Sequence, residues 1–171
     1  KLYQLGAVPV TCSDSRGTVY DARGVDLELL KDIKFNRRES LEAYAKEHPE
    51  AEYIPVSKYP EGGHAVWHIE TYAAFPCATQ NELTEIDAKA LVKNGCTSVT
   101  EGANMPSTPE AIHILQESHI CFAPAKAANA GGVAVSEFEM SQNAQMQRWS
   151  FEEVDAKLKE TMVHICTNVA E

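Results

Sequence analysis

Short strands and helices alternate most clearly in residues 83–123, LTEIDAKALVKNGCTSVTEGANMPSTPEAIHILQESHICFA. The expected elements are helices at 83–94 and 109–118 and strands at 97–101 and 120–123. Gly95 lies just beyond the first helix, and Pro109 stands at the first position of the second, which are the places these residues prefer. Such alternation predicts parallel strands joined by helical crossovers, with a ligand site outside the carboxyl ends of the strands.

The segments on either side of this stretch are less regular. Strands are expected at 7–12, 52–55 and 72–77, and helices at 26–46, 132–147 and 150–169. The polar centre FNRRES, residues 35–40, favours a break in the first of these helices. Ser150 and Glu153 predict a capping box at the start of the last one. Residues 1–5, followed by Gly6, are typical of the last turn of a helix, so we expect the sequence to begin inside a domain.

The composition is that of one globular domain: 171 residues, 44% hydrophobic and 23% charged. The formal net charge of −10 argues against nonspecific binding to nucleic acids or anionic membranes. No apolar run approaches the roughly 20 residues of a membrane span. The 5 cysteines are odd in number and widely spaced, which argues against a disulfide framework and a metal knuckle. Together with the lack of a visible targeting segment, this cysteine usage favours a cytoplasmic protein.

Four polar segments follow the expected strands: SDS (13–15), CATQN (77–81), GAN (102–104) and PAKAANAGGV (124–133). We expect all four to lie along one edge of a parallel sheet and to outline a cleft of dinucleotide size. Glycine lets a ligand approach the backbone closely, and asparagine offers both a donor and an acceptor. The alternative is that these segments are ordinary connectors, in which Ser107 or Thr108 only caps the next helix.

The residues after the first expected strand bear on the choice of cofactor. Asp14 is suited to the adenosine ribose of NAD. Ser13 and Ser15, with Lys34 and Arg37 further along, suit the additional phosphate of NADP. We therefore expect NADP, with NAD as the less favoured cofactor. The alternative is that the basic residues here form a solvated run of charge.

Other reactive side chains carry weaker signals. His64 and His68 have the spacing of a zinc-binding helix, but Ala65 stands where a metalloprotease needs its glutamate. We therefore expect no zinc site at this pair. Cys77 has no histidine partner in the sequence, which leaves a thiol nucleophile as a minor alternative.

Several long motifs together resemble a known family: SDSRGTVYD (13–21), PCATQNEL (76–83), EGANMPSTPEA (101–111), AKAANAGGVAVS (125–136) and EMSQN (139–143). They are similar to the second domain of the hexameric glutamate dehydrogenases, most closely the NADP-dependent type. The resemblance implies an α/β fold with a Rossmann-like doubly wound sheet, here lacking its first strand and glycine-rich loop, followed by C-terminal helices. Residues 1–131 would be a partial dinucleotide-binding domain. Residues 132–171 would be a helical segment linking back toward an N-terminal substrate domain that is not in this sequence.

The resemblance also implies roles for individual residues. The nicotinamide and its ribose would lie beside Gly102, Ala103, Asn104 and Asn129. The adenosine side would border Ala78, Thr79 and Gln80, and the 2′-phosphate would lie near Ser13, Ser15, Lys34 and Arg37. Val133 and Ser136 would contact the glutamate side chain, with the Ser136 hydroxyl donating to its γ-carboxylate.

The implied reaction is the reversible oxidative deamination of L-glutamate to 2-oxoglutarate and ammonia by a homohexamer that uses NADP. No residue here takes a catalytic role, because the family's acid/base residues lie in the N-terminal domain, and the sequence alone is expected to be inactive. Ala125, Tyr72 and Glu137-Phe138 stand where the family usually has glycine, aspartate and Gly-Leu.

Three alternatives remain open at this point. They are a stand-alone nucleotide-binding regulatory module, a scaffold fragment that binds no cofactor, and a related dehydrogenase for leucine or phenylalanine. Ser136 argues against the last, because an apolar substrate side chain has no use for a γ-carboxylate donor.

Overall fold

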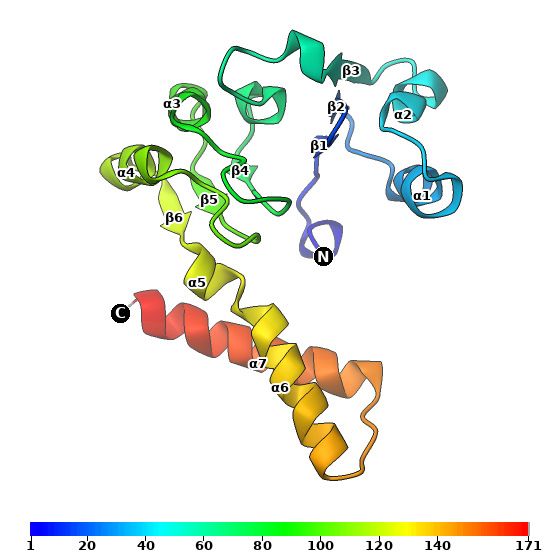
Figure 1. Ribbon diagram of the computed structural model, residues 1–171, viewed down its shortest axis with the longest axis vertical. Helices are drawn as coiled ribbons and strands as arrows, with labels where there is room; N and C mark the ends of the chain where they lie inside the picture. The colour runs from blue at the N-terminus through cyan, green and yellow to red at the C-terminus, as the bar shows by residue number, and fades with distance from the viewer. Residues whose placement is uncertain (171) are drawn as a thin grey trace.

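Two small sheets and a helical hairpin make up the computed structural model, which describes residues 1–170 (Figure 1). The antiparallel sheet contains, in order, β1 (Thr11–Asp14), β2 (Gly17–Tyr20) and β3 (Glu52–Pro55). The parallel sheet contains, in order, β4 (Ala73–Ala74), β5 (Ser98–Thr100) and β6 (Cys121–Ala123). The parallel pairing of β5 with β6 confirms the prediction made from residues 83–123.

Helices and short helical turns lie between the strands and after them. They are η1 (Tyr3–Leu5), α1 (Leu27–Lys31), η2 (Asp32–Arg37), α2 (Glu42–Glu47), η3 (Val56–Lys58), η4 (Ala65–His68), α3 (Glu85–Lys93), α4 (Pro109–Glu117), α5 (Ala125–Ala128), α6 (Ala130–Ala144) and α7 (Phe151–Ala170). The break predicted in the first helix is confirmed. Helix α1 runs into the π-helical turn η2, which is followed by Arg38 in a left-handed conformation (φ 55°) before α2 begins.

The segment Ser13-Asp14-Ser15 does not lie where we predicted. The strand expected at 7–12 is β1, which begins later, includes Ser13 and Asp14, and turns at once into β2. Asp14 Oδ1 accepts a hydrogen bond from the Arg16 N–H (2.9 Å), which stabilises this tight turn. A tight turn produces antiparallel pairing, whereas parallel pairing needs a long crossover. The segment therefore belongs to the antiparallel sheet, and the prediction of one edge shared by all four polar segments was wrong for it.

Local capping signals set the ends of the helices around the parallel sheet. The side chains of Thr84 and Asp87 form a capping box at the start of α3, and Gly95 follows that helix at φ 75°. Of the two candidate caps before α4, Thr108 is the one used, because its Oγ1 accepts from the Ala111 N–H at 3.3 Å. These short-range signals explain why the sequence predicts this part of the chain well.

Each sheet has its own hydrophobic core. The largest buried side chains are Leu83, Leu91, Val99 and Leu115 around the parallel sheet, and Val19, Ile33, Leu41 and Tyr44 around the antiparallel sheet. Residues 56–68 cross from one sheet to the other. Trp67 in this segment joins the core of the parallel sheet, and the Tyr59 hydroxyl lies 2.7 Å from that of Thr18 on β2.

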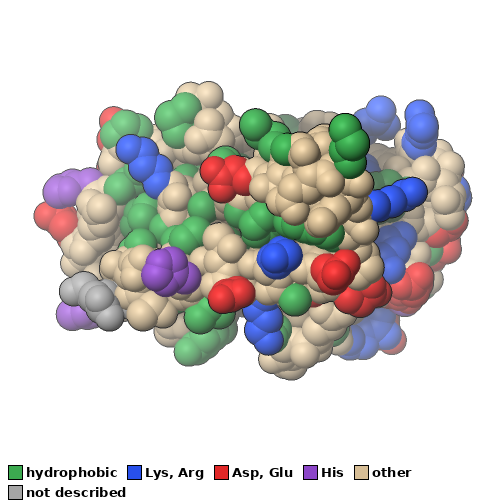
Figure 2. Space-filling view, turned by 90° about the horizontal axis from the view of Figure 1, so that it is seen from below, with side chains coloured by type: hydrophobic (Ala, Val, Ile, Leu, Met, Phe, Trp, Pro, Cys, Tyr) green, Lys and Arg blue, Asp and Glu red, His purple; other side chains and the backbone are tan. Residues whose placement is uncertain are grey.

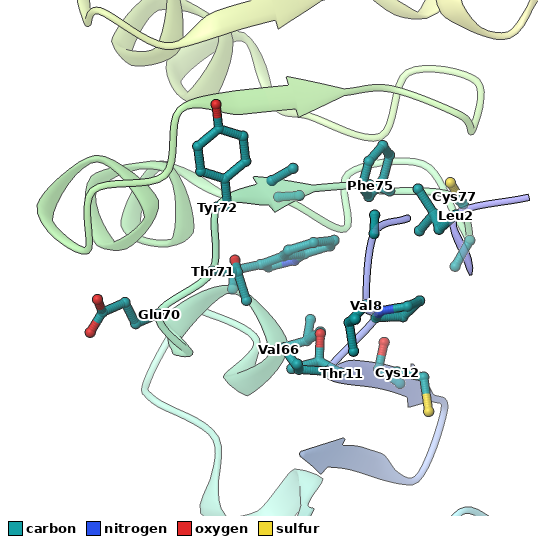
Figure 3. A pocket seen from close by; sticks show the side chains of 18 of the residues that line it. Leu2, Val8, Thr11, Cys12, Val66, Glu70, Thr71, Tyr72, Phe75 and Cys77 are labelled. Carbon is teal, nitrogen blue, oxygen red and sulfur yellow. The ribbon is translucent and has the colours of Figure 1, made fainter. Parts of the chain in front are cut away.

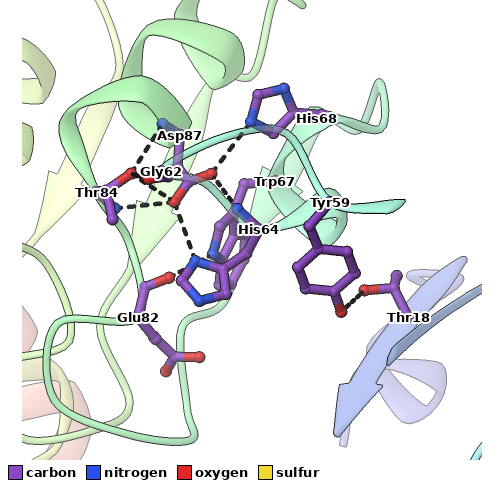
Figure 4. Close-up of polar contacts among 9 residues, drawn as sticks. All are labelled: Thr18, Tyr59, Gly62, His64, Trp67, His68, Glu82, Thr84 and Asp87. Carbon is purple, nitrogen blue, oxygen red and sulfur yellow. Dashed lines mark hydrogen bonds and ion pairs between the residues drawn. The ribbon is translucent and has the colours of Figure 1, made fainter. Parts of the chain in front are cut away.

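The buried carboxylate of Asp87 holds this crossing segment in place (Figure 4). It accepts hydrogen bonds from the backbone N–H groups of His64 (2.7 Å) and Thr84 (3.0 Å). His64 Nδ1 lies 3.3 Å from Oδ2, and His68 Nε2 lies 3.1 Å from Oδ1. Both histidines of the zinc-like pattern therefore contact a carboxylate inside the protein. Within residues 1–170, no group of three or more His, Cys, Asp or Glu side chains is placed to hold a metal ion.

Helices α6 and α7 form a hairpin that extends away from both sheets (Figure 1). The predicted capping box precedes α7, with the Glu153 N–H donating to Ser150 Oγ (3.2 Å) and the Ser150 N–H donating to Glu153 Oε2 (2.7 Å). Gly131 lets the helices approach closely, because a Cβ there would lie 3.3 Å from Leu158 Cδ1. The domain boundary predicted between residues 131 and 132 falls inside α6.

The hairpin carries apolar side chains on its surface. Seen from below, hydrophobic and charged side chains are mixed on this face of the molecule (Figure 2). The exposed large apolar residues of the hairpin are Val133, Val135, Met140, Met146, Phe151, Val163 and Val169. Across residues 1–170, no helix is both long enough and apolar enough to cross a membrane.

Candidate functional site

Three loops that follow the parallel strands form the candidate site, and the third of them contains the short helix α5. They are residues 76–82 after β4, 101–105 after β5 and 124–129 after β6. The register pairs Ala74 with Val99 and Val99 with Phe122, so the carboxyl ends of the strands meet at one edge. Strand β4 is shorter than the strand expected at 72–77, because Pro76 has no N–H to donate to a ladder.

Backbone hydrogen bonds join the first loop to the second. The Pro76 carbonyl accepts from the N–H groups of Gly102 (2.9 Å) and Ala103 (3.0 Å). The two loops pack so closely that a Cβ on Gly102 would lie 2.5 Å from Cys77 Sγ. A side chain larger than hydrogen at this position would therefore force the Cys77 thiol or one of the loops to move.

Side chains join the second loop to the third. Asn129 Nδ2 donates to the Ala103 carbonyl (3.1 Å), and the Ala125 N–H donates to Oε2 of the buried Glu101 carboxylate (2.7 Å). The other oxygen of this carboxylate, Oε1, is buried without a hydrogen-bond partner in residues 1–170. A buried acceptor of this kind is usually satisfied by an ordered water molecule.

Most of the residues that were predicted to border the nicotinamide lie close together in the structure. Gly102, Ala103 and Asn129 belong to one hydrogen-bonded unit, and Asn104 is exposed beside it. The Asn129 amide oxygen remains to accept a hydrogen bond, because only its nitrogen is used by Ala103. In the first loop, the predicted residues 78–80 are all exposed.

Cys77 is not arranged as a nucleophile. Burial raises the pKa of its thiol, and the negative charge of Glu82 raises it further. A hydrogen bond from the Gly102 backbone lowers the pKa by a smaller amount. A thiol of raised pKa holds little thiolate at neutral pH, which argues against the minor alternative of thiol catalysis.

A second group of predicted residues gathers at the end of β1. Ser13, Asp14 and Lys34 line a cavity of about 260 Å³ with an apolar wall that includes Phe35. Lys34 Nζ donates to Asp14 Oδ2 (2.7 Å), so a hydroxyl, a carboxylate and an ammonium group meet there. This donor and acceptor set fits the ribose and phosphate of an adenosine nucleotide.

Ser15 and Arg37 do not line this cavity. Ser15 lies in the turn between β1 and β2. The Arg37 guanidinium contacts three carboxylates, those of Asp32 (3.0 Å), Glu39 (3.7 Å) and Glu47 (2.6 Å). Arg37 is therefore held by three carboxylates outside the cavity, whereas Lys34 has one carboxylate partner and lines the cavity, which makes Lys34 the better placed of the two predicted cations.

Low pH should reduce the stability of the fold by protonating Asp14. Burial alone would raise the pKa of Asp14, but hydrogen bonds from Lys34, Arg16 N–H and Leu41 N–H, with the Lys34 charge, hold it below its usual value. A carboxylate with a lowered pKa in the folded state contributes stability above its unfolded pKa of about 3.9 and loses it as the pH falls further. Urea unfolding from pH 7 to 3 should therefore show a steeper loss in the wild type than in Asp14→Asn. Asp155→Asn, at an exposed carboxylate, should follow the wild type, and parallel curves for all three would contradict this assignment.

A cavity of about 780 Å³ lies between the two sheets (Figure 3). It is lined by residues 7–13, 70–75, 77 and 78, with Leu2, Val66, Trp67 and Glu82. Within the described residues β1 pairs only with β2, and β4 only with β5, so an unpaired edge of each strand borders the cavity. The volume lies in the range of ligand pockets. Ser13 lines both this cavity and the smaller one, which connects the two candidate regions.

The predicted substrate residues lie on α6. Asn129 immediately precedes this helix, and Ser136 lies seven residues further on, about 10 Å along the axis. Val133 and Ser136 are both exposed, and the Ser136 hydroxyl donates to the Gly132 carbonyl (3.2 Å) of its own helix. The unusual Phe138 packs toward Trp149 (ring centroids 6.3 Å apart), and α6 continues without interruption past it.

Three carboxylates of the site region were missed by sequence reasoning: Glu82, Asp87 and Glu101. Each accepts hydrogen bonds from backbone N–H groups. Asp87 had a signal, because Thr84 three residues earlier completes a capping-box pattern. Glu82 and Glu101 contact loops whose conformation no local pattern predicts.

Comparisons with known proteins agree on one family. A family model described as Glutamate/Leucine/Phenylalanine/Valine dehydrogenase matches residues 1–171. The chain is 57% identical to the NADP-specific glutamate dehydrogenase of Helicobacter pylori, matching all of this chain and 38% of that protein. It is 46% identical to the NADP-specific glutamate dehydrogenase of Haemophilus influenzae, over 98% of this chain and 36% of that protein. A glutamate dehydrogenase structure from Plasmodium falciparum superposes with a TM-score of 0.86 and 44% identity, over 96% of this chain and 34% of that one.

Proposed function

The chain belongs to the Glutamate/Leucine/Phenylalanine/Valine dehydrogenase family, and from that premise we propose that it is the cofactor-binding part of an NADP-dependent glutamate dehydrogenase. It spans 38% of the length of the relative from Helicobacter pylori. The observation that carries the proposal is the set of three hydrogen-bonded loops at the carboxyl ends of β4, β5 and β6, because dinucleotides bind at that edge of an α/β sheet.

The residues of the site fit the parts of the cofactor. Gly102, Ala103 and Asn104 would hold the nicotinamide end, with the free amide oxygen of Asn129 accepting from a ribose hydroxyl. Residues 78–80 would border the adenosine side. At the far end Ser13 and Lys34 would bind the 2′-phosphate, and Asp14 would hold Lys34 toward it. Ser15 and Arg37, which lie outside this cavity, would have to reorient to reach the phosphate.

The proposed reaction is the reversible oxidative deamination of L-glutamate to 2-oxoglutarate and ammonia. NADP supplies the hydride acceptor for the substrate α-carbon when it is bound. The residues of this chain bind and orient: Val133 would contact the substrate side chain, and the Ser136 hydroxyl would turn from Gly132 to donate to the γ-carboxylate. We assign no acid/base residue within this chain.

The wider organisation is also proposed. Residues 1–131 would form the nucleotide-binding part, and residues 132–171, with the hairpin, would lead toward a substrate domain. The resemblance to the hexameric enzymes supports a homohexamer, and the cysteine usage supports a cytoplasmic location.

Glutamate-dependent reduction of NADP by the full-length protein tests the function directly. Turnover with glutamate, and not with leucine or phenylalanine, is the expected result, because Ser136 offers a hydroxyl donor. Binding of NADP without turnover of any amino acid would instead favour a regulatory nucleotide-binding module. A folded protein that binds neither NADP nor NAD would favour the scaffold alternative.

Lys34 should set the preference for NADP. Lys34→Ala is expected to weaken NADP binding about tenfold while NAD binding changes little, since a charge-assisted hydrogen bond to phosphate contributes roughly 1.5 kcal/mol or more. Lys46→Ala is the control, because Lys46 forms an exposed ion pair with Glu42 outside the site. Isothermal titration with both cofactors would measure the ratio. If Lys34→Ala lost the same amount of affinity for NADP and for NAD, Lys34 would not be the residue that binds the 2′-phosphate.

A further inference from the structure

The carboxylate of Glu82, the last residue of the loop 76–82, holds that loop in place. Glu82 Oε1 accepts hydrogen bonds from the backbone N–H groups of Ala78 (2.7 Å) and Thr79 (3.2 Å). Glu82 is partly buried and lines the large cavity, whereas the loop residues that it holds are exposed. The Glu82 side chain therefore ties the exposed part of the loop to the body of the protein, in addition to the Asn81 N–H, which donates to the Met105 carbonyl (3.0 Å).

The position of Glu82 is itself fixed. Its carbonyl accepts the indole N–H of Trp67 (2.8 Å), a residue of the buried core (Figure 4). The next residue, Leu83, is fully buried, and its N–H donates to the Pro106 carbonyl (2.9 Å). The backbone of Glu82 is therefore fixed by the core, and a side chain on a fixed backbone can set the conformation of the loop that it contacts.

We propose that Glu82 is a positioning residue for the cofactor, which fixes residues 78–80 in the conformation that borders the adenosine side. This inference rests on the proposed function, because the cofactor assignment of these three residues comes from there. Both N–H groups point to Glu82, so the loop presents its side chains and carbonyl groups to the ligand. Neither N–H is left for a cofactor phosphate, and this separates Glu82 from the residues that touch the ligand.

The role requires an acceptor at this position more than it requires a charge. Hydrogen bonds to an ionised acceptor are stronger than neutral ones, but a glutamine oxygen occupies the same place and accepts from the same two N–H groups. Glu82→Gln should therefore keep the loop, and Glu82→Ala should release it. Glu85→Gln is the matched control, because Glu85 is a nearby carboxylate whose ion-pair partner is the exposed Lys89.

Steady-state kinetics of the full-length protein give the first test. Glu82→Ala is expected to raise the KM for NADP about tenfold and to leave the KM for glutamate and the kcat within about twofold, since the proposed function places this loop beside the cofactor and not beside glutamate. Glu82→Gln should stay within about threefold of the wild type in every parameter, and Glu85→Gln should match the wild type. An equal change in both KM values, or no change in Glu82→Ala, would overturn the inference.

Alkylation of Cys77 at pH 8 gives a second readout that does not depend on turnover. The Glu82 charge raises the pKa of the Cys77 thiol, so both Glu82 variants should react faster than the wild type. NADP should protect Cys77 in the wild type and in Glu82→Gln, but not in Glu82→Ala at the same concentration. Peptide mass mapping would measure the extent of alkylation at each cysteine. The exposed Cys166 serves as the fast-reacting reference, and Cys12, whose pKa burial raises to about 11, serves as the slow-reacting reference.

The two proposals fail in different ways. If wild-type protein bound no NADP, and NADP protected no cysteine, the proposed function would be wrong and the cofactor role of Glu82 would fall with it. If wild-type protein bound NADP normally while Glu82→Ala showed the same NADP affinity and the same protection, only the role of Glu82 would be wrong. A variant that loses all activity together with a lowered Tm would assign Glu82 to folding and would also overturn the inference.

Discussion

Replacing Asp87 with alanine is expected to lower the free energy of unfolding by about 3 to 5 kcal/mol, because it removes the fully buried carboxylate at the centre of a polar network. The carboxylate accepts from the backbone N–H groups of His64 and Thr84 and contacts the rings of His64 and His68. Alanine leaves these donors without a buried acceptor and removes the capping box of α3. Urea unfolding followed by circular dichroism would measure the loss.

A surface pair of the same chemistry is the control. Glu117 lies 3.4 Å from His113 on α4, and both side chains are exposed. Glu117→Ala should therefore unfold at nearly the same urea concentration as the wild type. Asp87→Asn keeps one oxygen as acceptor and should fall between the wild type and Asp87→Ala. If Asp87→Ala were as stable as Glu117→Ala, the crossing segment would not depend on this carboxylate.

Replacing Gly102 with alanine is expected to weaken NADP binding about 10- to 100-fold. The new Cβ would lie 2.5 Å from Cys77 Sγ, so either the thiol or the loop has to move. Overpacking of this kind costs about 1 to 3 kcal/mol. The cost should appear in cofactor affinity because the same backbone donates to Pro76 and carries the residues assigned to the nicotinamide. Fluorescence titration with NADPH would measure it.

Removing the thiol should restore much of that affinity. In the double variant Gly102→Ala with Cys77→Ala the atom in closest contact is absent, and the Cβ of residue 77 lies 3.4 Å away. Cys77→Ala alone should bind nearly as well as the wild type, because no role in holding the cofactor is assigned to the Cys77 side chain and the backbone bonds of the loop are kept. A double variant no tighter than Gly102→Ala would mean that the glycine is required by the ligand itself and not by the packing of the two loops.

How far the sequence predicts this fold depends on how local the signals are. Pro109 with the Thr108 cap, and Gly95 with its left-handed backbone, act within a few residues of the ends that they set, so α3 and α4 were predicted nearly to the residue. The turn after β1 depends on a hydrogen bond from Arg16 to Asp14, for which Asp-Ser-Arg-Gly is only a weak sequence signal. Strand β2 and the antiparallel sheet were therefore not predicted.

In the candidate site, too, the features with local sequence signals were predicted and those that depend on distant contacts were not. The loops could be found from their glycine and asparagine content, and the family motifs assigned residues to parts of the cofactor. The hydrogen bonds that fix these loops could not be found, because Glu82 and Glu101 accept from backbone groups whose positions depend on the finished fold. In the same way, nothing in the spacing of Lys34 and Arg37 indicates that one contacts Asp14 and the other contacts three carboxylates.

The unpaired edges of β1 and β4 bear on how these residues behave in solution. Each edge carries backbone donors and acceptors that no other strand in the described residues uses, and the 780 Å³ cavity separates them. Free edges of this kind recruit any extended chain that reaches them. Preparations of residues 1–171 should therefore associate more readily as concentration rises, and a peptide with the alternating pattern of a strand should compete with that association.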